Sequence, residues 1–255
     1  MKISINDLLR HLKLQLIRIK SVDTESEFLS NLSEELRARQ LFLDYYGINL
    51  LLDVGANSGQ YATLMRRIGY KGKIISFEPL KIAFAELKNN AKGDRSWECE
   101  NFALGDNEQK AVIHVAGNSY SSSLLDILPS HIDFDANSKY VSDEEIQIKR
   151  LDDVFHNYCD STDIVMLKID TQGFEKRVLE GSRHSLRDIT LLQLEMSIEP
   201  LYENEVLFVD MINYLHAEGF DLFALENGIR NPRSGKLLQA DGVFLNRNKT
   251  IKIHV

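Results

Sequence analysis

Residues 51–60 read LLDVGANSGQ, a short apolar run that leads into a glycine-bearing turn. The run from Leu50 to Val54 is too short for a helix and is stopped by Gly55, so it predicts a buried strand. Gly55 lets the chain turn tightly and lets a ligand approach the backbone, and Gly59 relieves packing where the next helix begins. Because nucleotides bind at the carboxyl ends of parallel strands, beside helix N-termini, this stretch predicts a nucleotide site.

The polar residues near this turn narrow the kind of nucleotide. A dinucleotide fingerprint would place glycines where this chain has Asn57 and Gln60, and the Gly-Lys-Ser/Thr of a phosphate-binding loop is missing as well. Glu78, at the end of the next predicted strand, can accept both hydrogen bonds of a ribose diol. Asp53 can orient an amino-acid head group near the turn. A ribose and an amino acid without a pyrophosphate loop indicate S-adenosylmethionine (SAM).

Beyond residue 49, short apolar runs alternate with helical patterns, which predicts an α/β fold with a largely parallel sheet. The strands are expected at residues 50–54, 73–77, 97–104, 111–115, 163–169 and 190–194. The last two apolar runs, 220–225 and 243–245, flank a turn-rich segment without a helix, so they should pair antiparallel. The longest predicted connection, residues 117–140, is rich in Ser, Asp and Asn, and such long loops often carry function.

The composition is that of an ordinary globular protein, with 255 residues, 44% of them hydrophobic, and a net charge of −8. An acidic chain lacks the basic face that nonspecific nucleic-acid binding needs, so no nucleic-acid partner is expected. Cys99 and Cys159 form no metal-binding or disulfide pattern. Because no stretch approaches ~18 apolar residues and no cleavable signal is evident, we expect a cytoplasmic protein.

The first 20 residues differ from the rest of the chain, with five basic side chains against one acidic. Their apolar residues recur at helical spacing, which predicts an amphipathic basic helix. A second helical stretch is expected over residues 26–46. We expect a helical extension over residues 1–48, before one domain over residues 49–255. Two roles for the basic helix stay open, namely docking on its own chain or in a homodimer, and peripheral contact with the inner face of a membrane.

Seven motifs, in order along the chain, carry a specific resemblance. They are LLDVGANSGQ (51–60), IISFEP (74–79), FALGD (102–106), SSSL (121–124), RLDDV (150–154), LKIDTQGFEKRVLEG (167–181) and LQLEMS (192–197). The chain thereby resembles the FkbM family of SAM-dependent methyltransferases. The resemblance implies the class I, Rossmann-like methyltransferase fold, with a mostly parallel seven-stranded sheet and an antiparallel C-terminal strand. It also implies O-methylation, commonly of a sugar or natural-product hydroxyl, with glycans and glycolipids as expected acceptors.

The cofactor-binding residues expected on this basis are Asp53, Gly55, Asn57, Gly59, Glu78, Asn101, Ala103, Asp106 and Asp170. By position, residues 55–59 would line the methionine end of the cofactor and Glu78 its ribose. The adenine edge would fall to residues 101–106. Asp106 has the alternative of capping the turn that follows it.

Two carboxylates are expected at the ends of neighbouring strands. Methyl transfer to oxygen needs a positioned acceptor and a base that takes the hydroxyl proton, and a carboxylate can be that base. Asp170 and Glu195 could act as a base with an orienting partner, hold a divalent cation that binds substrate oxygens, or have a structural role. Lys168 lies on the same strand face as Asp170 and either neutralises that carboxylate or takes part in catalysis. Glu175 is expected as an acid in the first turn of the following helix.

The long connection holds the expected contacts to a small-molecule or glycan acceptor. Ser122 and Ser123 could hydrogen-bond a polyol or could be ordinary turn residues. His131 could serve as an alternative base or could make an ordinary polar contact. Two other functions stay open. One is a catalytically silent SAM-binding or scaffold module, and the other is an NAD(P)-dependent oxidoreductase, against which the missing glycines weigh.

Overall fold

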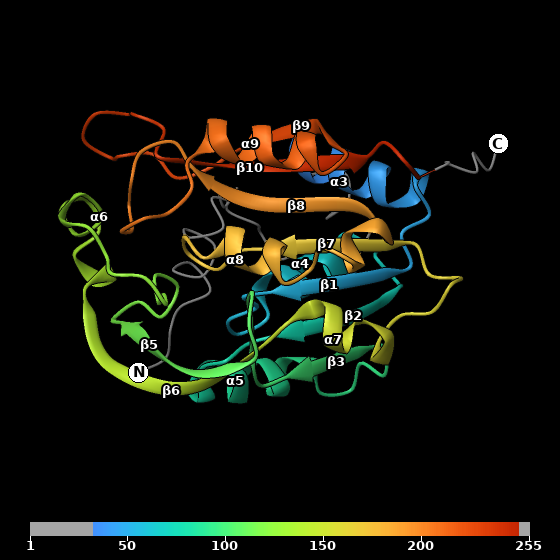
Figure 1. Ribbon diagram of the computed structural model, residues 1–255, viewed down its shortest axis with the longest axis horizontal. Helices are drawn as coiled ribbons and strands as arrows, with labels where there is room; N and C mark the ends of the chain where they lie inside the picture. The colour runs from blue at the N-terminus through green and yellow to red at the C-terminus, as the bar shows by residue number, and fades with distance from the viewer. Residues whose placement is uncertain (1–32, 250–255) are drawn as a thin grey trace, which may run out of the picture.

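The computed structural model describes residues 33–249, and its main feature is a seven-stranded sheet in the order β3-β2-β1-β7-β8-β10-β9 (Figure 1). Strand β10 pairs antiparallel with both of its neighbours, and the other pairs of this sheet are parallel. This confirms the predicted class I methyltransferase sheet with its antiparallel C-terminal strand. The strands are β1 Leu50–Val54, β2 Lys73–Phe77, β3 Trp97–Glu100, β7 Val165–Ile169, β8 Ile189–Ser197, β9 Phe220–Asn227 and β10 Gln239–Asn246.

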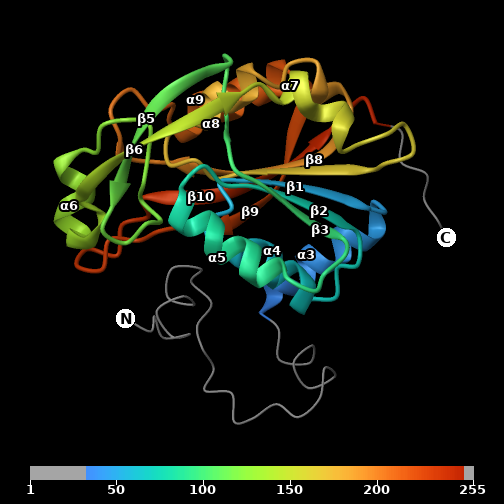
Figure 2. The same ribbon diagram turned by 90° about the horizontal axis from the view of Figure 1, so that it is seen from below.

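Helices cover both faces of the sheet, with α3, α4 and α5 on one face and α7, α8 and α9 on the other (Figure 2). Strands β1 and β7 are buried at every residue, as their continuous apolar runs predict. Leu50 and Leu52 pack in one core cluster and Leu51 packs in the other, because successive side chains of a strand point to opposite faces. The helices are α3 Glu34–Tyr45, α4 Gln60–Arg67, α5 Lys81–Ala91, α7 Leu151–Val154, α8 Glu175–Glu180 and α9 Phe208–Ala217.

A second sheet, of three strands, lies at one end of the main sheet (Figure 1). It consists of β4 Ala103–Leu104, β5 Gln109–Ala116 and β6 Tyr140–Lys149. The prediction of one continuous strand over residues 97–104 was wrong. The chain leaves the main sheet after β3 and joins the second sheet as β4, which pairs with β6. The strand predicted at 111–115 is present within β5, which pairs antiparallel with β6.

The long connection between β5 and β6 contains helical turns, α6 Pro129–Phe134 and η1 Ala136–Ser138. Two further short 3-10 turns, η2 Phe155–Asn157 and η3 Ser185–Arg187, follow α7 and α8. The second sheet packs its apolar side chains, such as Ile146 and Ile148, against the beginning of α5. The second sheet is therefore anchored to α5, one of the helices that cover the main sheet.

Helix α3 belongs to the core of the molecule. It begins after Ser33, whose side chain accepts a hydrogen bond from the Leu36 amide at 3.3 Å. Phe42 and Leu43 are buried in the same cluster as Leu51 of β1. The helical stretch predicted over residues 26–46 is thus confirmed over residues 34–45, and residues 26–32 lie outside the described part of the chain.

The basic helix predicted over residues 1–20, with its homodimer and membrane alternatives, lies outside the described residues. Within residues 33–249, no helix is long and apolar enough to cross a membrane.

Candidate active site

The turn after β1 lies in backbone contact with the end of β7. Gly55 has a φ of +74°, and a Cβ at this position would lie 1.8 Å from the carbonyl oxygen of Asp170. The Asp170 amide donates a hydrogen bond to the carbonyl of Val54 at 3.1 Å. Because a side chain at position 55 would collide with this backbone, glycine is what lets the two strand ends meet. The fold thereby brings the glycine turn and the carboxylate of Asp170 together.

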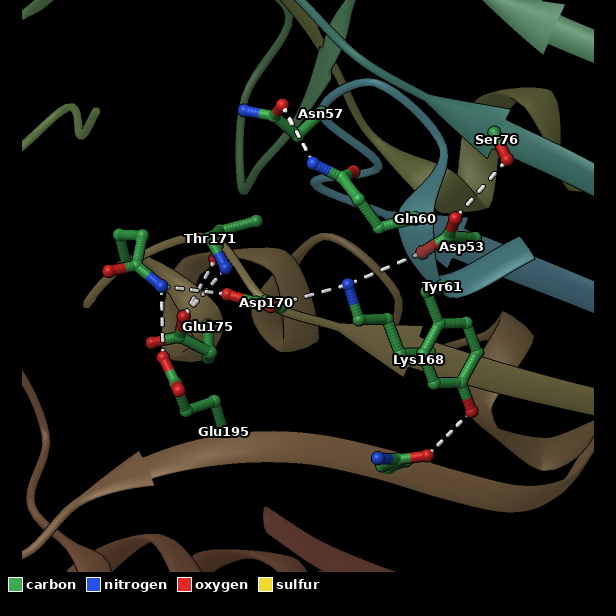
Figure 3. A network of polar contacts seen from close by, with 12 residues as sticks. Asp53, Asn57, Gln60, Tyr61, Ser76, Lys168, Asp170, Thr171, Glu175 and Glu195 are labelled. Carbon is green, nitrogen blue, oxygen red and sulfur yellow. Dashed lines mark hydrogen bonds and ion pairs between the residues drawn. The ribbon is translucent and has the colours of Figure 1, made fainter. Parts of the chain in front are cut away.

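Gly59 and Asn57 shape the turn itself. Gly59 is the N-cap of α4 with a φ of +85°, and a Cβ there would lie 2.8 Å from the ring of Trp97. It therefore faces the interior and allows α4 to pack closely. Asn57 adopts a φ of +47°. Its side-chain oxygen accepts hydrogen bonds from the Ser58 amide at 2.8 Å and from the Gln60 side chain at 3.2 Å (Figure 3).

Glu78 follows β2 directly and reaches back to the glycine turn. One of its carboxylate oxygens accepts a hydrogen bond from the Asn57 amide at 2.8 Å, and the other accepts one from the Leu80 amide at 2.7 Å. Burial raises the pKa of Glu78 to about 7, although both amide hydrogen bonds favour the ionised form. Each oxygen keeps a second lone pair, so the carboxylate can still accept hydroxyl donors.

The three residues expected at the adenine edge separate in the structure. The side chain of Asn101 donates to the backbone carbonyl of Glu78 at 2.9 Å, so it lies beside the glycine turn. Ala103 is buried in β4 of the second sheet. Asp106 accepts a hydrogen bond from Arg177 of α8 at 2.7 Å, in an ion pair that neither of its predicted roles includes.

Lys168 joins two carboxylates across neighbouring strands (Figure 3). Its Nζ lies 3.3 Å from Asp53 Oδ1 and 3.4 Å from Asp170 Oδ2, and the Asp53 side chain is fully buried. Ser76 donates to the other oxygen of Asp53 at 3.2 Å. Burial alone would lower the pKa of Lys168, but the two carboxylates outweigh it and hold the pKa above its ordinary value. Lys168 therefore stays protonated and neutralises the carboxylates on either side.

Asp170 and Glu195 are held together by Gln172, which the sequence reasoning did not single out. The Gln172 amide nitrogen donates to Asp170 at 2.8 Å and to Glu195 at 2.9 Å. Its oxygen accepts from the Tyr202 hydroxyl at 2.8 Å, which fixes the orientation of the amide. Gln239 donates to the same oxygen of Glu195 at 2.9 Å. The signal was present, since Gln172 lies within the motif at 167–181, but its left-handed φ of +57° is not visible in the sequence.

The carboxylate pair does not assemble a cation site. An amide donor, rather than a further oxygen ligand, lies between Asp170 and Glu195. Across residues 33–249, no three His, Cys, Asp or Glu side chains are grouped so that they could hold a metal ion. The donor set therefore does not fit a divalent cation, and we derive no step through one.

The expected acceptor contacts serve the long connection itself. The Ser122 hydroxyl accepts a hydrogen bond from the Ala116 amide at 3.0 Å. The buried Ser123 hydroxyl donates to the backbone carbonyl of Gln172 at 2.7 Å. His131 is 2% exposed, and burial lowers its pKa to about 4. Ser123 thereby ties the connection to the turn after β7, in which Gln172 links Asp170 to Glu195.

The comparisons with known proteins show the family of this chain. The family model described as the methyltransferase FkbM domain matches residues 53–222. The chain belongs to the FkbM methyltransferase family. The matched residues of this FkbM chain include the glycine turn, Lys168, Asp170 and Glu195, whereas α3 and β10 lie outside the match. No curated protein matches the chain.

Solved structures resemble this FkbM chain at low identity. The magnesium protoporphyrin IX methyltransferase of Synechocystis PCC 6803, solved with bound SAM, is 9% identical with a TM-score of 0.48, and the match covers 96% of this chain and 86% of that chain. A putative tRNA (m1A22) methyltransferase of Streptococcus pneumoniae is 14% identical with a TM-score of 0.46, covering 86% and 72%. We infer no acceptor from either.

Proposed function

We propose that this protein is a SAM-dependent O-methyltransferase that acts on a hydroxyl of a sugar, glycan, glycolipid or related natural product. The observation that carries the proposal is the Asp170 carboxylate, 36% exposed, at the end of β7 beside the glycine turn. A carboxylate at this position can take the proton that a hydroxyl loses on methylation. Membership of the FkbM family supports methyl transfer itself.

The residues around the turn fit SAM. The buried carboxylate of Glu78 would accept hydrogen bonds from the ribose hydroxyls, and Asn101 beside it would border the adenine. The amino-acid end of SAM would lie beside the row of three linked charges formed by Asp53, Lys168 and Asp170. This row is close to the glycine turn, because Asp53 precedes the turn and Asp170 contacts Gly55. When bound, SAM supplies an electrophilic methyl group.

The chain's own part in the reaction is to place the acceptor and to move one proton. Asp170 would accept the proton of the acceptor hydroxyl while the hydroxyl oxygen takes the methyl group. A C–O bond would form as the C–S bond of the sulfonium breaks, and the products would be a methyl ether and S-adenosylhomocysteine. The exposed edge of Asp170 then passes the proton to water. Glu195, linked to Asp170 through Gln172, would orient the acceptor. Lys168 Nζ, 3.4 Å from Asp170, would hold this carboxylate in place.

The carboxylate pair also supports the acceptor class. Ionised carboxylates accept hydrogen bonds and do not donate them, so the acceptor must present donors. A sugar with neighbouring hydroxyls meets this requirement, whereas phosphates beside the reacting hydroxyl would be repelled. A small molecule or glycan is therefore favoured over a nucleic acid.

The free thiols of Cys99 and Cys159 are consistent with a cytoplasmic location.

The test is transfer of a radiolabelled methyl group from SAM to a panel of sugars, glycans, glycolipids and RNA. Asp170→Asn should lower turnover at saturating SAM by about 10² to 10⁴-fold, because the proton loses its acceptor. The exposed Asp210→Asn serves as the matched control and should leave turnover unchanged. Label on an RNA nucleobase would contradict the proposed acceptor. Wild-type turnover by Asp170→Asn would show that Asp170 is not the general base. SAM binding without any transfer would favour the silent module.

A further inference from the structure

Arg39 of α3 is a charged residue inside the molecule. It is 7% exposed, and its guanidinium forms an ion pair with Glu226 of β9. Its guanidinium carbon also lies 5.3 Å from the centre of the Tyr61 ring. Helix α3 precedes the residues that the family model matches, so this contact is a feature of the chain beyond the matched domain.

Tyr61 connects Arg39 to the candidate active site. It lies in the first turn of α4, directly after the glycine turn, and its ring centre is also 5.3 Å from Lys168 Nζ. The Tyr61 hydroxyl donates to Gln193 of β8 at 2.6 Å. The ring therefore packs within reach of both cations, and Figure 3 shows it beside Lys168. A displaced Arg39 would disturb the surroundings of Lys168 through this shared ring.

The charges on this face of the sheet are divided between the two cations. Asp241 of β10 lies opposite Glu226 in the strand register, so the positive charge of Arg39 compensates both carboxylates. Asp241 and Arg39 attract each other, and burial together with the charge of Asp170 raises the pKa of Asp241 to about 7. Lys168 forms ion pairs with Asp53 and Asp170. Asp241 is attracted by Lys168 as well as by Arg39, so without Arg39 the attraction of Lys168 toward Asp241 would be unshared.

We propose that Arg39 is a positioning residue of the cofactor site. The charge of Arg39 neutralises Glu226 and Asp241, so that Lys168 stays paired with Asp53 and Asp170. This pairing holds the Asp170 carboxylate beside the glycine turn. The inference rests on the proposed function, because it takes this row to be the amino-acid end of the SAM site. It makes a helix outside the matched family domain part of the binding machinery.

The test is the dissociation constant of SAM for full-length variants, measured by calorimetry well below their melting temperatures. Arg39→Met should weaken SAM binding roughly 3- to 30-fold, the range seen for coupling through a packed network. Arg39→Lys keeps the charge and should recover most of the affinity. Arg39→Met with Glu226→Gln, which removes both charges of the pair, should recover part of it. Leu41→Ala, on the exposed side of α3, is the control and should bind SAM like the wild type.

The outcomes separate a positioning role from a structural one. A lower melting temperature of Arg39→Met with unchanged SAM affinity would overturn the inference, because the ion pair would then serve stability alone. If Arg39→Met does not fold, Arg39→Gln, which keeps a polar side chain without the charge, takes its place, and wild-type SAM affinity in that variant would equally overturn the role. Failure of the wild-type chain to bind SAM would instead refute the proposed function, and the inference with it.

Discussion

Glu78 is the residue on which the cofactor assignment depends most. Because its pKa is raised to about 7, the ionised fraction grows between pH 6 and pH 8, and the ionised form is the better acceptor for hydroxyl donors. SAM affinity of the wild type should therefore rise over this interval. Glu78→Gln should lose roughly 10- to 100-fold in affinity and the pH dependence with it, since hydrogen bonds to a charged group contribute ~1.5–3 kcal/mol. Calorimetry at pH 6, 7 and 8 measures both, and equal affinities in the two proteins would refute the ribose role.

The sequence predicts individual site residues where strand alternation and strand ends fix them. Asp170 directly follows the last residue of β7, and Lys168 shares a face with it, because successive side chains of a strand alternate. Glu195 was expected to end the next strand, but β8 continues to Ser197, so Glu195 lies within β8. Gln172 could not be predicted, since its role depends on a left-handed backbone and on Tyr202, which lies 30 residues away along the chain.

At the scale of elements, the hydroxyl of Ser123 joins the long connection to the turn after β7. It donates to the Gln172 carbonyl and accepts from the Leu125 amide at 3.0 Å. Ser123→Ala should lower the free energy of unfolding by about 1–3 kcal/mol, because two partly buried backbone groups lose their partner. Urea denaturation measures the change. Ser142→Ala, at an exposed position of β6, should stay within about 0.5 kcal/mol, and an equal effect of the two would contradict the link.

The strands of the main sheet were predictable, whereas in the second sheet only the strand at 111–115, within β5, was predicted. Continuous apolar runs such as 50–54 and 73–77 mark strands buried on both faces, and both have the predicted bounds. Strand β6 has a mostly polar sequence, YVSDEEIQIK, in which Ile146 and Ile148 are the buried apolar residues. Its strand character comes from pairing with β5, a contact that a local pattern does not contain.

At the scale of the whole molecule, buried titratable groups set how stability depends on pH. Burial raises the pKa of Glu175 to about 7, against 4.5 for an ordinary glutamate, so the folded state binds this proton more tightly. Stability from this group is present below pH 4.5 and is lost as the pH rises toward 7. His131, with its pKa lowered to about 4, acts in the opposite sense, because stability falls as the pH drops from 6.5 toward 4.

The prediction is that Glu175→Gln reduces the loss of stability between pH 5 and pH 7. Unfolding free energies from urea denaturation at pH 5, 6 and 7 give the slope for each protein. Glu108→Gln, at an exposed position, is the control and should keep the wild-type slope. A wild-type slope in Glu175→Gln would show that this carboxyl has no raised pKa in the folded protein.

The measurement that tests the account most directly is a thermal-shift titration with SAM and S-adenosylhomocysteine beside NADH and NADPH. A ligand at a hundred times its dissociation constant stabilises the folded state by ~2.7 kcal/mol. For a chain of this size we predict a rise in melting temperature of roughly 5 to 11 °C with the SAM pair and none with the nicotinamides. A shift with the nicotinamides alone, or no shift with any of the four, would contradict the account.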